Sequence, residues 1–222
     1  FTTVDFKNDL SGVTQIGYYS FSAMNKLEKV TIPGTMTFAT REKTYTGDSE
    51  ASQVSYTFDK NSALKSVVFE EGITEIPGAL FSNCFNLETV TLPSTITEIG
   101  SRTFDQNIKL HTVDLTKCSK PVSLKNSFNC YNKDGVTIGI CTFYVSNASV
   151  ITIDKTLGGT RPQKCNVAVT NGGTFPAGTT FESGKLATPT KDGCALAGWY
   201  TKDGTNDDWG DKVTSSTTLT AG

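Results

Sequence analysis

Apolar residues return along this chain at a fixed spacing of 23 residues. Two consecutive segments carry the same apolar positions: Ile73, Ile76, Phe81, Leu87, Val90 and Leu92, and then Ile96, Ile99, Phe104, Leu110, Val113 and Leu115. Each position in the second segment lies 23 residues after its counterpart. A fixed period between 20 and 50 residues is typical of a solenoid, in which each repeat stacks on its neighbours.

Further copies of this frame extend in both directions. They are anchored upstream by Val13, Ile16, Phe21, Leu27, Val30 and Ile32, then by Phe58, Leu64, Val67 and Phe69, and downstream by Phe128, Cys130 and the apolar run Val136–Val145. Phe21 and Phe58 are 37 residues apart, which indicates an insert of 14 residues in the polar stretch Thr35–Thr57. We therefore predict about five repeats, with Val4 and Phe6 as the tail of a sixth.

Each repeat predicts one short strand in a parallel sheet, because the L-x-x-V-x-I spacing alternates apolar and polar positions. In Leu27–Ile32 the Leu, Val and Ile point inward, while Glu28, Lys29 and Thr31 face the concave surface of the solenoid. The phenylalanines that recur once per repeat are expected to form a stacked column in the core: Phe21, Phe58, Phe81, Phe104 and Phe128.

The full pattern, I-x-x-I-[GP]-x-x-x-[LTS]-F-x-x-C-x-x-L-x-x-V-x-[IL]-P, resembles the BspA-like leucine-rich repeats of bacterial and some protozoan surface proteins. The resemblance covers about Val4–Val150, and we place the solenoid at residues 1–153. Leu115 is followed by Thr116 rather than Pro, so the fourth copy departs from the pattern. The resemblance implies a secreted or surface-attached protein used in adhesion or host contact.

The repeat ends after Val150, and the Gly- and Pro-containing residues 154–164 predict a linker. Residues 165–222 resemble the Listeria-Bacteroides repeat, the B-repeat of internalin-type proteins, through the Gly198-Trp199-Tyr200-Thr201 run and the turns before it. Cys194 stands where that family has an aromatic residue. The resemblance implies a small β-grasp-like domain, in which Trp199 either anchors the core or stacks on a sugar.

The composition of the chain argues against nucleic-acid binding and against a membrane span. The chain has 20 Lys and Arg against 22 Asp and Glu, a net charge of −2, and no basic stripe for nucleic acid. The ten-residue run Val136–Val145 is about half of the length that a bilayer span requires. Because the chain opens at Phe1 without a basic and apolar leader, we expect a removed signal peptide or an excised fragment. We expect a monomer.

Few residues offer catalytic or metal chemistry. His111 is the single histidine, and in the repeat frame it is a solvated surface residue rather than a general base. The cysteine spacing does not suit zinc, and Asp203–Asp211 resembles a calcium loop only in its acidity. The scattered carboxylates Glu28, Glu88 and Asp114 do not predict a glycosidase cleft. We therefore expect no enzyme activity, no cofactor and no metal.

The cysteines leave alternatives open. Cys84 and Cys130 follow a column phenylalanine and are expected to be free core thiols. In an oxidising compartment Cys118 can pair with Cys141, or Cys165 with Cys194.

The hypothesis from the sequence is a secreted or cell-surface adhesion protein that binds a host or neighbouring-cell protein or glycan through its concave face. The expected contact residues are the exposed positions of four consecutive strands: Glu28, Lys29, Thr31, Lys65, Ser66, Val68, Glu88, Thr89, Thr91, His111, Thr112 and Asp114. The alternative is a structural stalk that spaces a functional domain elsewhere in a longer polypeptide. An enzyme of unrecognised type is a third reading.

Overall fold

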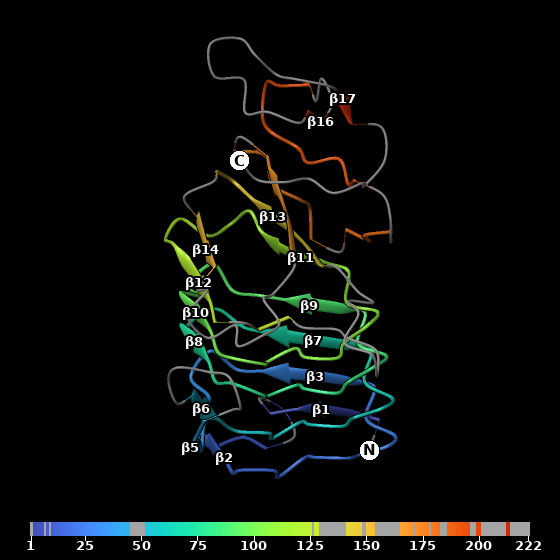
Figure 1. The fold of residues 1–222 in the computed structure, drawn as a ribbon. Coiled ribbons are helices and arrows are strands. Elements are labelled where there is room, and N and C mark those ends of the chain that lie inside the picture. Colours follow the sequence, from blue (N-terminus) through green and yellow to red (C-terminus); the bar gives the residue numbers. More distant parts are fainter. Residues whose placement is uncertain are drawn as a thin grey trace.

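The structure is a computed structural model of the 222-residue chain. It describes residues 2–6, 8, 10–44, 52–125, 127–128, 141–147, 150–153, 165–170, 172–177, 179–182, 186–195, 199–200 and 212–213. These residues form short strands joined by turns, stacked as successive rungs of a solenoid (Figure 1). The fold is mainly β with parallel sheets, as the repeat pattern predicted.

The first strand of each rung contributes to one long parallel face of the solenoid (Figure 1). Four strands pair in the order β1-β3-β7-β9, and three more pair in the order β11-β13-β15. Their bounds are β1 Thr3–Asp5, β3 Lys29–Ile32, β7 Ser66–Phe69, β9 Thr89–Thr91, β11 Thr112–Leu115, β13 Cys141–Val145 and β15 Cys165–Val169. The register places Val30 beside Val67 and Val67 beside Val90. Each repeat therefore adds one strand with its apolar side chains facing inward.

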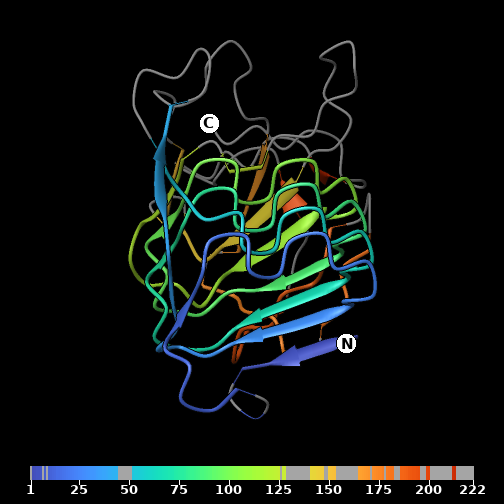
Figure 2. The ribbon, with the colours of Figure 1, turned by 90° about the horizontal axis from the view of Figure 1, so that it is seen from below.

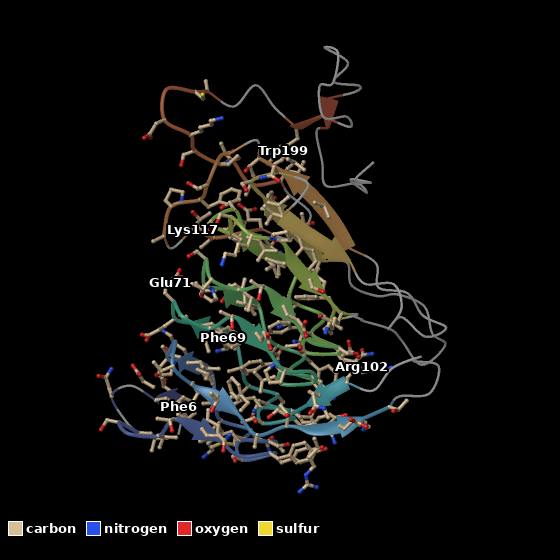
Figure 3. The ribbon with its side chains drawn as sticks, turned by 90° about the vertical axis from the view of Figure 1, so that its left-hand side faces the viewer. Phe6, Phe69, Glu71, Arg102, Lys117 and Trp199 are labelled. Atoms are coloured by element: carbon tan, nitrogen blue, oxygen red, sulfur yellow. The ribbon has the colours of Figure 1, made fainter. Side chains whose placement is uncertain are left out.

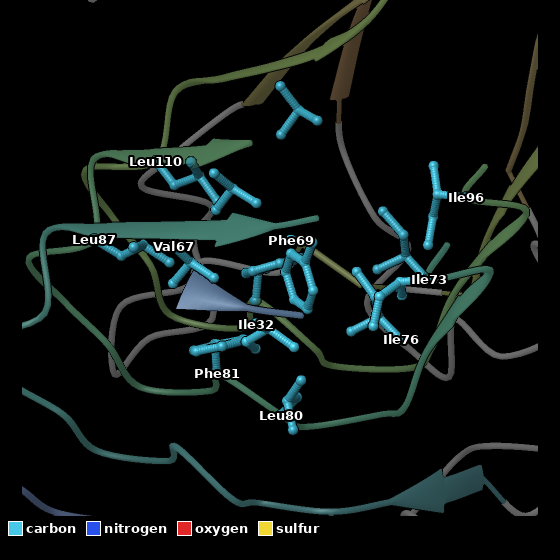
Figure 4. Packing of buried hydrophobic residues seen from close by; sticks show 14 of the residues in the cluster. Ile32, Val67, Phe69, Ile73, Ile76, Leu80, Phe81, Leu87, Ile96 and Leu110 are labelled. Carbon is cyan, nitrogen blue, oxygen red and sulfur yellow. The ribbon is translucent and has the colours of Figure 1, made fainter. Parts of the chain in front are cut away.

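The second strand of each rung builds another parallel sheet along the side of the stack. Its order is β14-β12-β10-β8, and a separate pair, β2-β4, belongs to the first rungs. The bounds are β2 Gln15–Ile16, β4 Thr37–Phe38, β8 Glu75–Ile76, β10 Glu98–Ile99, β12 Val122–Leu124 and β14 Ile151–Ile153. The two columns of strands enclose one hydrophobic core whose members run from Val4 to Val167. Figure 4 shows part of it.

The predicted phenylalanine column is confirmed. Ring centroids of consecutive members lie 4.9–5.9 Å apart, and their planes are within 26° of parallel, from Phe21 through Phe58, Phe81 and Phe104 to Phe128. The turn around each ring has a fixed shape, since the residues two before and two after Phe81 and Phe104 have positive φ. The non-glycine residues in this left-handed region are Tyr19, Ala23, Tyr56, Lys60, Ala79, Asn83, Arg102 and Gln106. The packing of each rung holds these φ values against their intrinsic cost.

Polar side chains tie neighbouring rungs together at the turns. Asn61 is fully buried, donates from Nδ2 to the carbonyls of Phe21 and Phe58, and accepts the backbone N–H of Met24. Asn107 repeats this role by accepting the N–H of Cys84. At another corner, the Glu71 carboxylate accepts hydrogen bonds from the N–H and hydroxyl of Ser94, and these bonds lower the pKa of Glu71.

The predicted insert between Phe21 and Phe58 forms an antiparallel hairpin. Its arms are β5, Arg41–Lys43, and β6, Ser52–Val54, with Arg41 opposite Val54. Figure 2 shows the arms extending along one side of the stack. The chain leaves the rung after Ala39 and rejoins it at Val54, where a parallel bridge to Gly78 restores the repeat.

Residues 165–169, the first of the predicted C-terminal module, pair in parallel with β13 through β15. The solenoid sheet therefore continues past the predicted linker, which lies outside the described residues. Two further strands, β16 Trp199–Tyr200 and β17 Lys212–Val213, pair antiparallel. Phe6 lies near one end of the stack and Trp199 near the other (Figure 3). Independent folding of the C-terminal module and its β-grasp-like fold stay predictions.

Candidate functional site

The predicted contact residues lie together on the outer side of the long sheet. They are the outward side chains of β3, β7, β9 and β11, together with the residue before each of these strands. The register puts Lys29 beside Ser66 and Ser66 beside Thr89, so the columns run straight from rung to rung. We call this surface, which comprises the twelve residues Glu28, Lys29, Thr31, Lys65, Ser66, Val68, Glu88, Thr89, Thr91, His111, Thr112 and Asp114, the open face.

Exposure on the open face falls toward β11. Six of its side chains are exposed: Glu28, Lys29, Lys65, Glu88, Thr89 and Thr91. Thr31, Ser66, Val68, His111 and Asp114 are half-buried. Thr112 is buried, unlike the other predicted contact residues, so its side chain adds little to this surface. Its hydroxyl lies 3.1 Å from Nδ1 of His111, and its neighbour in the register is Thr142, which is also buried.

Charge on the open face is mixed. Lys65 and Glu28, on adjacent rungs, form an ion pair with Nζ and Oε2 3.2 Å apart. Asp114 accepts both the N–H and the hydroxyl of Thr116, so its carboxylate closes a turn rather than facing a ligand. The surface therefore presents threonine hydroxyls beside charges of both signs.

His111 does not have the surroundings of a general base. Burial lowers its pKa, and Glu88 on the preceding rung opposes that shift. Among the described residues, the hydrogen-bond neighbour of its ring is the hydroxyl of Thr112, and no carboxylate is bonded to the ring. In the described part of the chain, no cluster of three or more His, Cys, Asp or Glu side chains is arranged to hold a metal ion. The acidic stretch Asp203–Asp211 lies outside the described residues.

Comparisons with known proteins bear on the repeat. A family model described as a BspA-type leucine-rich repeat region matches residues 1–46 and 52–156, more than half of the chain, with six copies. The chain belongs to this family. The match begins at residue 1 and so covers Val4 and Phe6, where we predicted the tail of a sixth copy. The match ends at residue 156, so the likeness of the C-terminal segment to the B-repeat stays a prediction.

A solved structure, the crystal structure of pneumococcal vaccine antigen PcpA, is similar at 17% sequence identity and a TM-score of 0.32. The alignment covers 74% of this chain and 56% of that one, so the chain spans little more than half of its length. No curated protein matches the chain. Among the described residues, none forms a helix with the length and apolar character needed to span a membrane.

Beyond the open face, the same side of the sheet is covered by the C-terminal segment of this leucine-rich repeat chain. Tyr144 on β13 is 1% exposed and, with Ala168 on β15, packs against Phe175, Phe181, Leu186, Ala187 and Trp199. The Tyr144 ring lies 4.9 Å from Phe175 and 5.7 Å from Trp199. The Tyr144 hydroxyl accepts the N–H of Ala187, and Trp199 Nε1 donates to the Ala187 carbonyl. In this arrangement Trp199 anchors packing. We call these two strands and the segment over them the covered face.

The cysteines with described side chains are thiols rather than disulfides. Cys84, Cys118 and Cys141 are buried and Cys194 is exposed, so neither of the two disulfides left open by the sequence is formed. Burial raises the pKa of Cys84 to about 12, and burial together with Asp114 and Glu71 raises that of Cys118 to about 11. Such thiols are unreactive near neutral pH. Cys130 lies outside the described residues.

Two clusters of exposed aromatic or apolar side chains were not predicted from the sequence. Tyr18, Tyr19 and Tyr56 pack together where the hairpin rejoins the stack, and Tyr19 is 47% exposed. Arg41 and Lys43 from β5 lie over the rings of Tyr18 and Tyr56. The neighbouring tyrosines were visible in the sequence, but only the fold brings the insert to them. Phe85 and Ile108, equivalent positions on adjacent rungs, are each 45% exposed.

Proposed function

We propose that this chain is a non-enzymatic surface or secreted interaction module that binds a host or neighbouring-cell protein through the open face. The observation that carries the proposal is the open face itself, a continuous strip of exposed outward side chains on β3, β7 and β9. Stacked repeats hold such a strip rigid while its side chains vary without disturbing the core, which is how repeat solenoids build binding surfaces. Family membership supports the adhesion role and the extracellular location.

A protein partner suits this surface better than a small ligand. The open face spans four strands and its exposed side chains are polar or charged, whereas small-molecule sites are enclosed pockets lined mostly by apolar groups. Charges of both signs on neighbouring rungs can set the orientation of a partner and raise its association rate. The exposed rings of Phe85 and Tyr19 add apolar anchor candidates outside the strip.

The test uses purified host matrix proteins and epithelial cells as probes, with the recombinant chain as analyte. In the double variant Lys29→Glu, Lys65→Glu, we expect at least a tenfold loss of association and an almost unchanged melting temperature. A matched double variant, Lys26→Glu, Lys120→Glu, carries the same charge change at exposed positions outside the open face and should bind normally.

Equal loss in both double variants would assign the binding to net charge rather than to the open face. Binding that survives the first variant and is abolished by Trp199→Ala with the fold intact would assign it to the C-terminal segment. Absence of binding to every probe would favour the alternative, a structural stalk within a longer surface protein.

A further inference from the structure

Three tyrosines from two neighbouring rungs pack into one cluster beside the hairpin insert. The rings of Tyr19 and Tyr56 stack with their centroids 5.1 Å apart and their planes 12° from parallel, and Tyr18 meets Tyr19 edge-on at 4.7 Å. Tyr56 is buried and Tyr18 is half-buried, whereas Tyr19 is 47% exposed. Tyr56 therefore supports one face of the Tyr19 ring, and much of that ring is open to solvent.

The repeat does not require a tyrosine at position 19. The residues two before each column phenylalanine share a positive φ between 53° and 60°, and they are Tyr19, Tyr56, Ala79 and Arg102. Alanine and arginine hold this conformation on the later rungs, so the backbone does not select an aromatic side chain. Tyrosine occupies the position on the two rungs next to the hairpin insert, where the ring meets side chains of β5.

The hairpin places two cations over the tyrosine rings. Side chains alternate along β5, so Arg41 and Lys43 share one face of the strand and Glu42 lies on the other. The Arg41 guanidinium carbon is 4.8 Å from the centroid of the Tyr18 ring, and Lys43 Nζ is 5.0 Å from that of Tyr56. Both cationic side chains are exposed. Cation–π attraction therefore holds two solvent-accessible positive charges beside the exposed ring.

The acid next to this cluster is withdrawn from solvent. Asp59 lies close enough to act on the Tyr19 hydroxyl, yet it is 2% exposed and accepts hydrogen bonds from Ser82 Oγ at 2.7 Å and Asn83 Nδ2 at 2.9 Å. No carboxylate forms an ion pair with Arg41 in the part of the chain that the structure describes. The surface over the tyrosines therefore presents positive charge.

The polar groups of this surface suit a carboxylate. The planar guanidinium of Arg41 can bind a carboxylate through two parallel N–H groups while it lies over an aromatic ring. Burial raises the pKa of Tyr19, and Tyr18 and Tyr56 raise it further, so the Tyr19 hydroxyl stays protonated and can donate a hydrogen bond. A cationic ligand would be repelled by Arg41 and Lys43.

A protein segment suits this surface better than a small anion. The cavity of about 560 Å³ beside the hairpin is lined by other residues, among them Met36, Phe38 and Gln53, and it encloses neither the tyrosine rings nor Arg41. Small ligands bind in enclosed sites, whereas exposed Tyr and Arg side chains are enriched among the residues that dominate protein interfaces. The cluster therefore offers the contacts of a protein interface.

We propose that Tyr18, Tyr19, Arg41 and Lys43, which we call the tyrosine–arginine patch, dock an acidic segment of a protein partner. A carboxylate of that segment pairs with the Arg41 guanidinium, and an apolar side chain beside the carboxylate packs on the Tyr19 ring. The patch is separate from the open face, because β5 and β6 lie at the side of the stack near β2 (Figures 1 and 2). It does not depend on a partner binding at the open face.

The test measures binding of an acidic peptide, acetyl-GSDELDSG-amide, and its neutral counterpart, acetyl-GSNQLNSG-amide, to the whole chain by fluorescence anisotropy at low ionic strength. The acidic peptide should bind at least about tenfold more tightly than the neutral one. The double variant Tyr19→Ala, Arg41→Gln should lose at least about tenfold in affinity for the acidic peptide. Arg41→Lys keeps the charge without the planar pair of N–H groups, so its affinity should lie between those of the parent chain and the double variant.

The matched control is the double variant Phe85→Ala, Lys109→Gln, which removes one exposed ring and one exposed positive charge elsewhere on the stack. It should bind the acidic peptide as the parent chain does, and an equal loss in the control would overturn the proposal in favour of net charge. Failure of the acidic peptide to bind, or equal binding of the two peptides, also overturns it. So does tighter binding of 3′-sialyllactose, whose carboxylate is carried by a sugar. If the first double variant does not fold, Arg41→Gln alone leaves the tyrosines in place and should show the same direction of change.

Discussion

The open face and the covered face are two parts of one side of the same solenoid, built from strands in the same parallel register. On the open face the outward side chains are threonines, serine, valine and charged groups, and six of them are exposed. On the covered face they include Tyr144 and Ala168, which are buried beneath Phe175, Phe181 and Trp199. The backbone is alike in both, so the outward residues decide whether the sheet closes on its own chain or stays accessible.

The difference also shows what an anchor on this surface requires. Tyr144 combines a large buried ring with a hydroxyl that accepts the N–H of Ala187. Buried aromatic residues with a satisfied polar tip dominate the energetics of protein interfaces. The open face has no aromatic side chain at its strand positions, so it lacks the kind of anchor that holds the C-terminal segment over β13 and β15.

The largest loss of stability is expected from a substitution in the phenylalanine column, which lies in the core behind the sheet. Phe104 stacks between Phe81 and Phe128, with ring centroids 5.9 and 5.0 Å away. Phe104→Ala leaves a cavity between two rungs and should lower the free energy of unfolding by about 3–5 kcal/mol. Phe85→Ala, at a position of the preceding rung that is 45% exposed, should lower it by only about 1 kcal/mol. Denaturant unfolding measures both, and a similar small loss in the two variants would contradict the shared column.

A smaller effect, confined to the covered face, is expected from Trp199→Ala. The ring is half-buried, so its loss should cost roughly 2 kcal/mol, below the range for a fully buried Trp. Limited proteolysis should then cut the C-terminal segment while the solenoid resists. Trp199→Phe retains a ring but loses the N–H that donates to the Ala187 carbonyl. Its free energy of unfolding should therefore lie between those of the parent chain and Trp199→Ala. Protease cuts that begin within the rungs would show that the segment and the solenoid fold as one unit.

A finer probe of the covered face is Tyr144→Phe. The ring packing remains, but the N–H of Ala187 loses its acceptor, and the free energy of unfolding should fall by about 0.5–1.5 kcal/mol. The exposed Tyr19 supplies the control, because Tyr19→Phe should leave the free energy of unfolding unchanged within error. Thermal unfolding of the three chains side by side is the measurement. No change in Tyr144→Phe would mean that water replaces the hydroxyl.

The smallest effect is expected on the open face. Lys65 and Glu28 form a solvent-exposed ion pair, and such pairs contribute about 0–1 kcal/mol. Lys65→Met should therefore change the melting temperature little, and high salt should reduce the difference further. A large loss of stability would mean that this strip is part of the structural core rather than a surface left free for a partner.

The strands, the phenylalanine column and the family could be predicted because apolar spacing fixes them. The 23-residue shift that relates Phe81 to Phe104 also sets which side chains face outward, so the positions of the open face followed from the same frame. The burial of Thr112 did not follow, because it depends on contacts in three dimensions at the end where the stack is covered.

Other features depend on contacts between segments far apart in the chain. Pro77 carried no signal of the cavity that residues 34–38, 52–53 and 72–78 line, since a proline after a strand is ordinary in this repeat and the hairpin lies beside Pro77 only in the fold. Pairing of β15 with β13 crosses residues whose Gly and Pro content predicted a linker. The composition of a segment says nothing about which distant segment lies beside it, so neither the cavity next to Pro77 nor the β13–β15 pairing could be predicted from composition.

The central claim is that one side of the sheet is open over β7 and β9 and covered over β13 and β15. Cysteine labelling tests it most directly, with Thr89→Cys as the open position, Ala168→Cys as the covered one, and native Cys84 as a buried reference within the same chain. After alkylation in the native state, peptide mass spectrometry should find Thr89→Cys modified quickly and Ala168→Cys as slowly as Cys84. Adding Trp199→Ala should speed labelling at position 168 alone. Equal rates at positions 89 and 168 in the parent background would contradict the account.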